Sequence, residues 1–108
     1  MKLRKDYQGR DVRLTDVRRQ HILQHPEMAN LESALEETLW HPQFVVGSLT
    51  DPAAELSYRF YHGTKVSDKW LCVVVKYAVN DAFVVTAYLT DKLKKGKPIW
   101  PIDRKSVV

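Results

Sequence analysis

The sequence predicts an α+β domain in which a short N-terminal hairpin and two helices pack on a four-stranded antiparallel meander sheet. Two observations predict this class. Helix signals are confined to about residues 15–40, and four segments rich in β-branched and aromatic residues follow, with only short turns between them. Helices and strands in separate blocks are typical of α+β folds, in which helices cover one face of an antiparallel sheet. The length of 108 residues suits a single domain, residues 1–108.

The N-terminal third predicts a hairpin and a first helix. Residues 2–14 form a hairpin that turns at Gln8-Gly9 in this interpretation. Thr15 or Asp16 can accept hydrogen bonds from the free amides of a first helical turn. Pro26 disfavours helical geometry at the residue before it, so we expect this helix to end at about His25.

The second helix is predicted over residues 31–40, with Asn30 as its cap. Five residues recur at helical spacing and form an apolar stripe, and three glutamates take the other side: Leu31, Ala34, Leu35, Thr38 and Leu39, against Glu32, Glu36 and Glu37. His41-Pro42 ends this helix as His25-Pro26 ends the first.

Four strands are predicted at about residues 44–49, 55–62, 69–79 and 82–90. The remaining segment, residues 91–108, is expected to be a basic irregular tail partly anchored by Trp100. The apolar segment 44–49 offers an edge at which two copies of the chain could pair, which leaves the oligomeric state open.

The charge distribution suits a polyanionic partner. The net charge is +4, with basic residues gathered in the first nineteen residues and in the tail, and an acidic stretch at 27–37 between them. Nucleic acid fits this pattern, although an ordinary solvated surface also explains it. No apolar run approaches the ~18 residues of a membrane span, and the charged N-terminus does not read as a signal peptide. The single cysteine, Cys72, favours a reducing, cytoplasmic location.

Alternation along the strands predicts a mixed face on the sheet. If the apolar faces meet the helices, five polar and aromatic side chains gather on the opposite surface: Arg59, Tyr61, Lys76, Thr86 and Tyr88. Cations and hydroxyls among aromatic rings suit RNA, because phosphates attract charge and unstacked bases stack on rings. The alternative is a solvated sheet face without a function.

His21 and His25 lie four residues apart on the first predicted helix. Three interpretations compete: a metal site, helix packing and acid–base chemistry. A zinc site needs a third ligand, and the other candidates, His41, His62 and Cys72, show no recognisable spacing, so no metal is expected. Histidine titrates near neutrality and can therefore transfer protons at physiological pH.

Three segments carry a family resemblance: "RLTDVRRQHILQHPEM", "LEETLWHPQFVVGSLTDP" and "KWLCVVVKYAVNDAFVVTAYLTDKLKKGKPIW". Together they resemble the phage-associated branch of the barnase–EndoU–colicin–RelE-like nucleases over about residues 11–100. The resemblance implies a RelE/barnase-like fold and metal-independent RNA cleavage without a cofactor. It also implies a toxin-like or phage- or mobile-element-associated role, with an antitoxin protein as a further partner.

The resemblance also suggests a site by position. His21 would be the acid–base group, with His25 as a second candidate, while Arg59 and Lys76 would hold the phosphate and Thr86 would donate a hydrogen bond to it. Further residues would bind the RNA by stacking or charge: Tyr61, Tyr88, Lys92, Lys94 and Lys95. The alternative is a non-catalytic module on the same fold that binds nucleic acid or protein.

Overall fold

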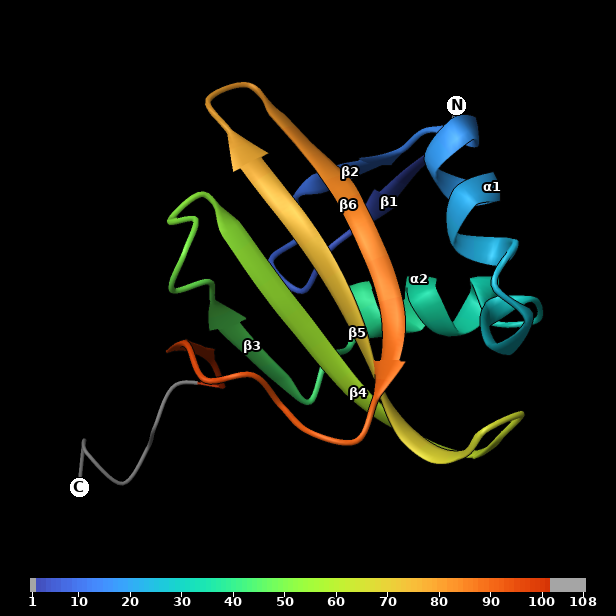
Figure 1. Cartoon of the computed structure of the whole chain (residues 1–108). Helices are drawn as coiled ribbons and strands as arrows, with labels where there is room; N and C mark the ends of the chain where they lie inside the picture. The colour runs from blue at the N-terminus through green and yellow to red at the C-terminus, as the bar shows by residue number, and fades with distance from the viewer. Residues whose placement is uncertain (1, 102–108) are drawn as a thin grey trace.

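The computed structural model describes residues 2–101 and consists of one seven-stranded sheet with two α-helices (Figure 1). The strands lie in the order β1-β2-β6-β5-β4-β3-β7. Their bounds are β1 (Lys2–Lys5), β2 (Asp11–Leu14), β3 (Phe44–Gly47), β4 (Ala54–Thr64), β5 (Ser67–Ala78), β6 (Asp81–Thr90) and β7 (Lys97–Trp100). The helices are α1 (Asp16–Leu23) and α2 (Glu32–Trp40), with a single 3₁₀ turn, η1 (Pro26–Met28), between them.

The prediction of a four-stranded antiparallel sheet is wrong, because three further strands extend it and one pairing is parallel. The strands β3, β4, β5 and β6 are antiparallel neighbours in sequence order. The hairpin β1–β2 joins them through a parallel bridge between Arg13 of β2 and Phe83 of β6. At the other side β7 pairs with β3, so β3 is not an edge open to a second copy of the chain.

The predicted irregular tail is therefore wrong for residues 97–100, which form β7. Sequence patterns did not reveal this strand because it is four residues long and contains Pro98. Residues 91–96 of the predicted tail contain no helix or strand, and its last part, residues 102–108 with Arg104 and Lys105, lies outside the described residues.

The predicted N-cap of the first helix is confirmed in the structure. Thr15 accepts a hydrogen bond from the backbone N–H of Arg18 at 3.2 Å, which makes it the N-cap. Asn30 does not cap α2, because Leu31 occupies that position and no side chain accepts a hydrogen bond there. No helix within residues 2–101 is long and apolar enough to cross a membrane.

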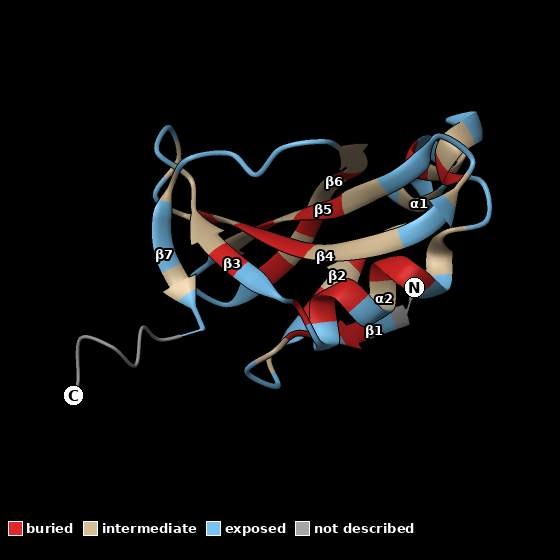
Figure 2. Ribbon diagram, turned by 90° about the horizontal axis from the view of Figure 1, so that it is seen from below, coloured by how far each residue is buried: buried red, intermediate tan, exposed pale blue. Residues whose placement is uncertain are grey.

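The helices cover one face of the sheet, and the main core lies between them. This helix-covered face takes its core residues from both helices and from the strands β2, β5 and β6; among them are Ile22, Leu35, Leu39, Leu71, Val73, Val75 and Val84. Figure 2 shows buried segments of α2 below the sheet and the 91–96 connection on the opposite side. We call that opposite side the open face.

A smaller core lies on the open face itself. Leu56, Tyr58 and Cys72 are buried there, with partly buried neighbours that include Trp70 and Tyr88. The sheet is thus apolar on both faces along β4 and β5, which the alternation argument did not anticipate. A bulge in β6 also changes the faces, because Val74 pairs with Thr86 while Val75 pairs with Val84.

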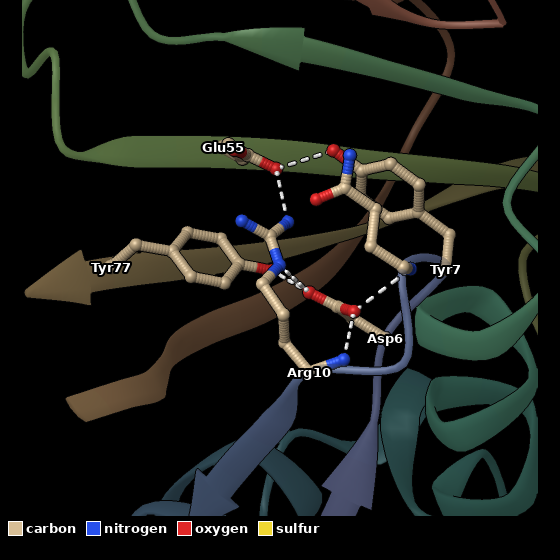
Figure 3. A network of polar contacts seen from close by, with 6 residues as sticks. Asp6, Tyr7, Arg10, Glu55 and Tyr77 are labelled. Atoms are coloured by element: carbon tan, nitrogen blue, oxygen red, sulfur yellow. Dashed lines mark hydrogen bonds and ion pairs between the residues drawn. The ribbon is translucent and has the colours of Figure 1, made fainter. Parts of the chain in front are cut away.

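A polar network fixes the N-terminal hairpin to the sheet (Figure 3). The Asp6 carboxylate is 1% exposed and accepts hydrogen bonds from the Arg10 guanidinium and the Tyr77 hydroxyl, both at 2.7 Å. Arg10 also contacts Glu55, which accepts a hydrogen bond from Tyr7 at 2.9 Å. Burial and the hydrogen bond to Asp6 raise the pKa of Tyr77 well above its usual value. The network is satisfied internally and serves to hold the hairpin in place.

Candidate nucleic-acid interface

The structure divides the predicted mixed face between the two sides of the sheet. Cross-strand partners share a face, and Arg59 of β4 pairs with Leu71 of β5, whose side chain lies in the helix-covered core. Arg59 there donates to the carbonyl of His41 at 2.8 Å and lies 3.4 Å from the Glu37 carboxylate. Arg59 is therefore placed against α2 and away from the open face.

Tyr61 follows Arg59 onto the helix-covered face. Its hydroxyl donates to the Ala34 carbonyl at 3.0 Å and lies 2.6 Å from Glu37. Burial, with the hydrogen bond to Glu37, raises the pKa of Tyr61 to about 12. The prediction that Tyr61 and Arg59 share a surface with the other three residues is wrong, because β4 turns its apolar residues to the open face while β5 turns Leu71, Val73 and Val75 to the helices.

Lys76, Thr86 and Tyr88 do share the open face. Val74 pairs with Leu56 on one side and Thr86 on the other, and Cys72 pairs with Tyr58 and Tyr88. Lys76 lies on the same face of β5, where its ammonium is 3.2 Å from the Asp51 carboxylate. Three of the predicted site residues are thus together, and they are the three that β5 and β6 provide.

His21 and His25 lie on and just beyond α1, and both side chains are exposed. Their rings contact one another edge to face, with centroids 6.0 Å apart, and His25 is 3.8 Å from Glu27. Because α1 packs against the helix-covered face, the sheet itself separates His21 from Lys76 and Thr86. The expectation of a pocket shared by His21 and these two residues is wrong.

The open face carries an aromatic cluster that sequence patterns did not identify, formed by Phe44, Phe60 and Trp70. The centroid of the Trp70 ring lies 5.1 Å from that of Phe60 and 5.7 Å from that of Phe44. Phe44 is 41% exposed, and the other two are half-buried. The three rings come from three adjacent strands, so only the strand register could have predicted their contact.

The connection between β6 and β7 and the first residue of β7 together present a row of lysines. We call these residues, Lys92, Lys94, Lys95 and Lys97, the lysine segment. All four are exposed, and none forms an ion pair with a carboxylate within residues 2–101. The Lys94 ammonium lies 5.7 Å from the centre of the Tyr88 ring. The ammonium groups of these lysines are therefore available to contact an external anion.

The lysine segment is held against the sheet at a defined place. The backbone N–H of Lys94 donates to the hydroxyl of the fully buried Tyr58 at 3.0 Å. Beside it lies a cavity of about 540 Å³, lined by apolar residues of β3, β4, β5 and β6, by Ser48, Thr50 and Asp51, and by Lys94 and Lys95. The cavity therefore has an apolar floor and a rim of hydroxyls, lysines and the Asp51 carboxylate, which pairs with Lys76.

The ionisable groups beneath the lysine segment stay neutral near pH 7. Burial raises the pKa of Tyr58 to about 12. Burial and the neighbouring Cys72 raise the pKa of Tyr88, and burial raises the pKa of the Cys72 thiol. The lysines therefore dominate the electrostatics of this part of the open face.

Gly96 allows the close approach that holds the lysine segment. A Cβ at this position would collide with the carbonyl oxygen of Gly47 and lie 3.2 Å from the Cβ of Val46. We expect Gly96→Ala to lower the free energy of unfolding by about 1–3 kcal/mol, because backbone rather than a flexible side chain must move. Chemical denaturation measures this effect. The exposed neighbouring substitution Lys95→Ala is the control, and equal stability of the two variants would contradict the close packing.

Within residues 2–101 no group of three or more His, Cys, Asp or Glu side chains is arranged to hold a metal ion. Comparison of the chain with protein-family models, with curated proteins and with solved structures finds no match.

Proposed function

We propose that this protein binds single-stranded RNA across the open face of its sheet and cleaves it without a metal ion. The observation that carries the proposal is the combination, on one face, of the aromatic cluster with lysines that have no carboxylate partner among residues 2–101. Single-stranded nucleic acid is bound elsewhere by the same two devices, rings that stack on bases and a positive track for the backbone.

The aromatic cluster and the lysine segment are joined through the strand pairing. Trp70 pairs with Thr90, the last residue of β6, and the lysine segment begins two residues later at Lys92. An RNA strand whose bases stack on Trp70 and Phe60 would thus have cations beside its backbone. Duplexes fit less well, because their bases are already stacked and cannot lie on these rings.

The cleavage activity in this proposal rests on the resemblance of the sequence to the barnase–EndoU–colicin–RelE-like nucleases. In metal-free RNA cleavage the neighbouring 2′-hydroxyl attacks the phosphorus, and donors stabilise the crowded phosphate. The lysine segment, whose side chains are exposed, can supply such donors. Lys76 and Thr86 lie further along the sheet, where Lys76 already pairs with Asp51. DNA lacks the 2′-hydroxyl, so the scheme makes RNA the substrate. An antitoxin that covers this face is the further partner implied by the resemblance.

A two-part experiment tests the proposal. The protein is incubated in EDTA with a labelled single-stranded RNA and with the DNA of the same sequence, and both binding and cleavage are measured. We expect binding of both strands and cleavage of the RNA alone, to fragments with 2′,3′-cyclic phosphate ends. Salt-sensitive binding without cleavage would instead support the non-catalytic module, and absence of binding would contradict the open face as an RNA site.

The lysine segment provides a quantitative prediction for binding. Each lost phosphate contact lowers the slope of log affinity against log salt by about 0.7 for single strands. We therefore expect Lys94→Ala/Lys95→Ala to reduce the slope by about 1.4 and to weaken binding similarly for all sequences. The control is Lys5→Ala/Arg18→Ala, which removes the same charge away from the open face and should leave the slope unchanged. Equal slopes for both double variants would exclude the lysine segment as the backbone site.

A further inference from the structure

We infer that His62, held by Asp68, is the group that exchanges protons with RNA bound on the open face. This inference rests on the proposed function and assigns a residue to it. Of the four histidines in the chain, His21 and His25 belong to α1 and its end, and His41 follows α2. His62 lies on β4 in the same alternation as Leu56, Tyr58 and Phe60, which places it on the open face.

His62 is adjacent to the aromatic cluster. Its ring centroid is 5.0 Å from that of Phe60, and the two rings lie nearly perpendicular, at 80°. Phe60 in turn contacts Trp70. A nucleobase stacked on Phe60 or Trp70 would therefore bring its own ribose and phosphate close to the imidazole.

A carboxylate orients the imidazole. The Nδ1 atom of His62 lies 3.3 Å from Oδ2 of Asp68, across the β4–β5 hairpin. The other oxygen, Oδ1, accepts the backbone N–H of Gly63 at 2.8 Å, so the carboxylate is fixed by the turn and not by the histidine alone. Gly63 has φ +68°, a conformation that glycine adopts readily, which allows this turn to form.

Asp68 is ionised at neutral pH. The hydrogen bond from Gly63, followed by the contact with His62, lowers the pKa of Asp68 below its usual value. Among the described residues Asp68 is the charged side chain in contact with His62. A carboxylate at Nδ1 fixes the tautomer and leaves Nε2 to exchange a proton. The His62 side chain is 80% exposed, so RNA can reach it.

The proposed step is balanced in atoms and charge. Nε2 of His62 takes the proton of the 2′-hydroxyl as the 2′-oxygen bonds to phosphorus. The bond between phosphorus and the 5′-oxygen breaks, and that oxygen takes a proton from the imidazolium or from water. The products are a 2′,3′-cyclic phosphate and a 5′-hydroxyl. Lys92 follows Thr90, the cross-strand partner of Trp70, by two residues, and in this proposal it is the cation that stabilises the phosphate.

Two variants and a matched control test the assignment. We expect His62→Gln to lower the rate of RNA cleavage by about 100-fold or more while changing RNA affinity less than about twofold. Asp68→Asn should lower the rate by a smaller factor, because it leaves the imidazole in place but removes the charge that orients it. His21→Gln, an exposed histidine on the other side of the sheet, should cleave at the wild-type rate.

The pH dependence separates a proton-transfer role from a structural one. In wild-type protein we expect the cleavage rate to rise with increasing pH, because only neutral imidazole accepts the proton. This increase of the rate with pH should be absent from His62→Gln. A His62→Gln variant that cleaves at the wild-type rate, or whose rate still increases with pH in the same way, would overturn the assignment.

A measurement that does not need cleavage keeps the two proposals distinguishable. Imidazole NMR signals are followed during titration with a 2′-O-methylated RNA strand, which binds but cannot react. We expect the signals of His62 to shift and those of His21 and His25 to remain unchanged. Binding with no shift at His62 would overturn the inference and leave the RNA-binding proposal standing. Binding with a shift at His62, but no cleavage of unmodified RNA by wild-type protein, would also overturn the catalytic role.

Discussion

Replacing Asp6 with alanine is expected to lower the free energy of unfolding by about 3–5 kcal/mol. The carboxylate is almost completely buried and is the common acceptor for the Arg10 guanidinium, the Tyr77 hydroxyl and two backbone N–H groups of the turn, those of Gln8 and Arg10. Its removal leaves Glu55 as the remaining charge partner of the Arg10 guanidinium. It also leaves the Tyr77 hydroxyl and the two backbone N–H groups without their acceptor, and these lost hydrogen bonds account for most of the cost.

The matched control is Asp11→Ala in the same hairpin. Asp11 pairs with Lys5, and both side chains are more than half exposed, so its loss should cost less than about 1 kcal/mol. Both variants are measured by urea unfolding with circular dichroism. Similar stabilities for the two variants would contradict the proposal that this network stabilises the attachment of the hairpin to the rest of the sheet.

Replacing Trp70 with alanine is expected to weaken RNA binding by about 5- to 150-fold. This range corresponds to the loss of one stacked base, about 1–3 kcal/mol. Trp70 lies at the centre of the aromatic cluster and contacts both Phe44 and Phe60, so its removal also separates these two rings. Fluorescence anisotropy with a labelled single-stranded RNA measures the change.

Two controls isolate stacking from other effects. Trp70→Phe keeps a ring and should recover most of the lost affinity. Trp40→Ala removes an exposed tryptophan at the end of α2, on the other side of the sheet, and should leave affinity unchanged. A larger effect from Trp40 than from Trp70 would move the RNA site away from the open face.

Local signals in the sequence predicted the elements better than their arrangement. Thr15 caps α1 as its chemistry predicts, and the two His-Pro pairs follow the ends of the helices. The sheet was harder, because the parallel bridge between β2 and β6 and the strand β7 depend on contacts between distant segments. Neither the single bridge at Arg13 nor a four-residue strand with a proline leaves a periodic pattern.

The candidate site was misassigned for one physical reason. Alternation separates the two faces of each strand, but it does not say which face of one strand lies beside which face of the next. On β5 both faces are apolar, and on β4 the apolar face is the open one, so the rule that apolar residues meet the helices failed for Arg59 and Tyr61. On β5 and β6 the apolar residues at these positions do face the helices. For that reason the prediction correctly placed Lys76, Thr86 and Tyr88 together on the open face.

The short outer strands have a consequence for the behaviour of the protein in solution. β1 and β7, which form the two borders of the sheet, have only four residues each. Pro98 cannot donate a backbone hydrogen bond, and Lys5 and Lys97 would repel the same residues of an incoming chain. These borders therefore resist templating fibril growth, and the protein should stay free of sheet-mediated aggregation at the concentrations that NMR requires.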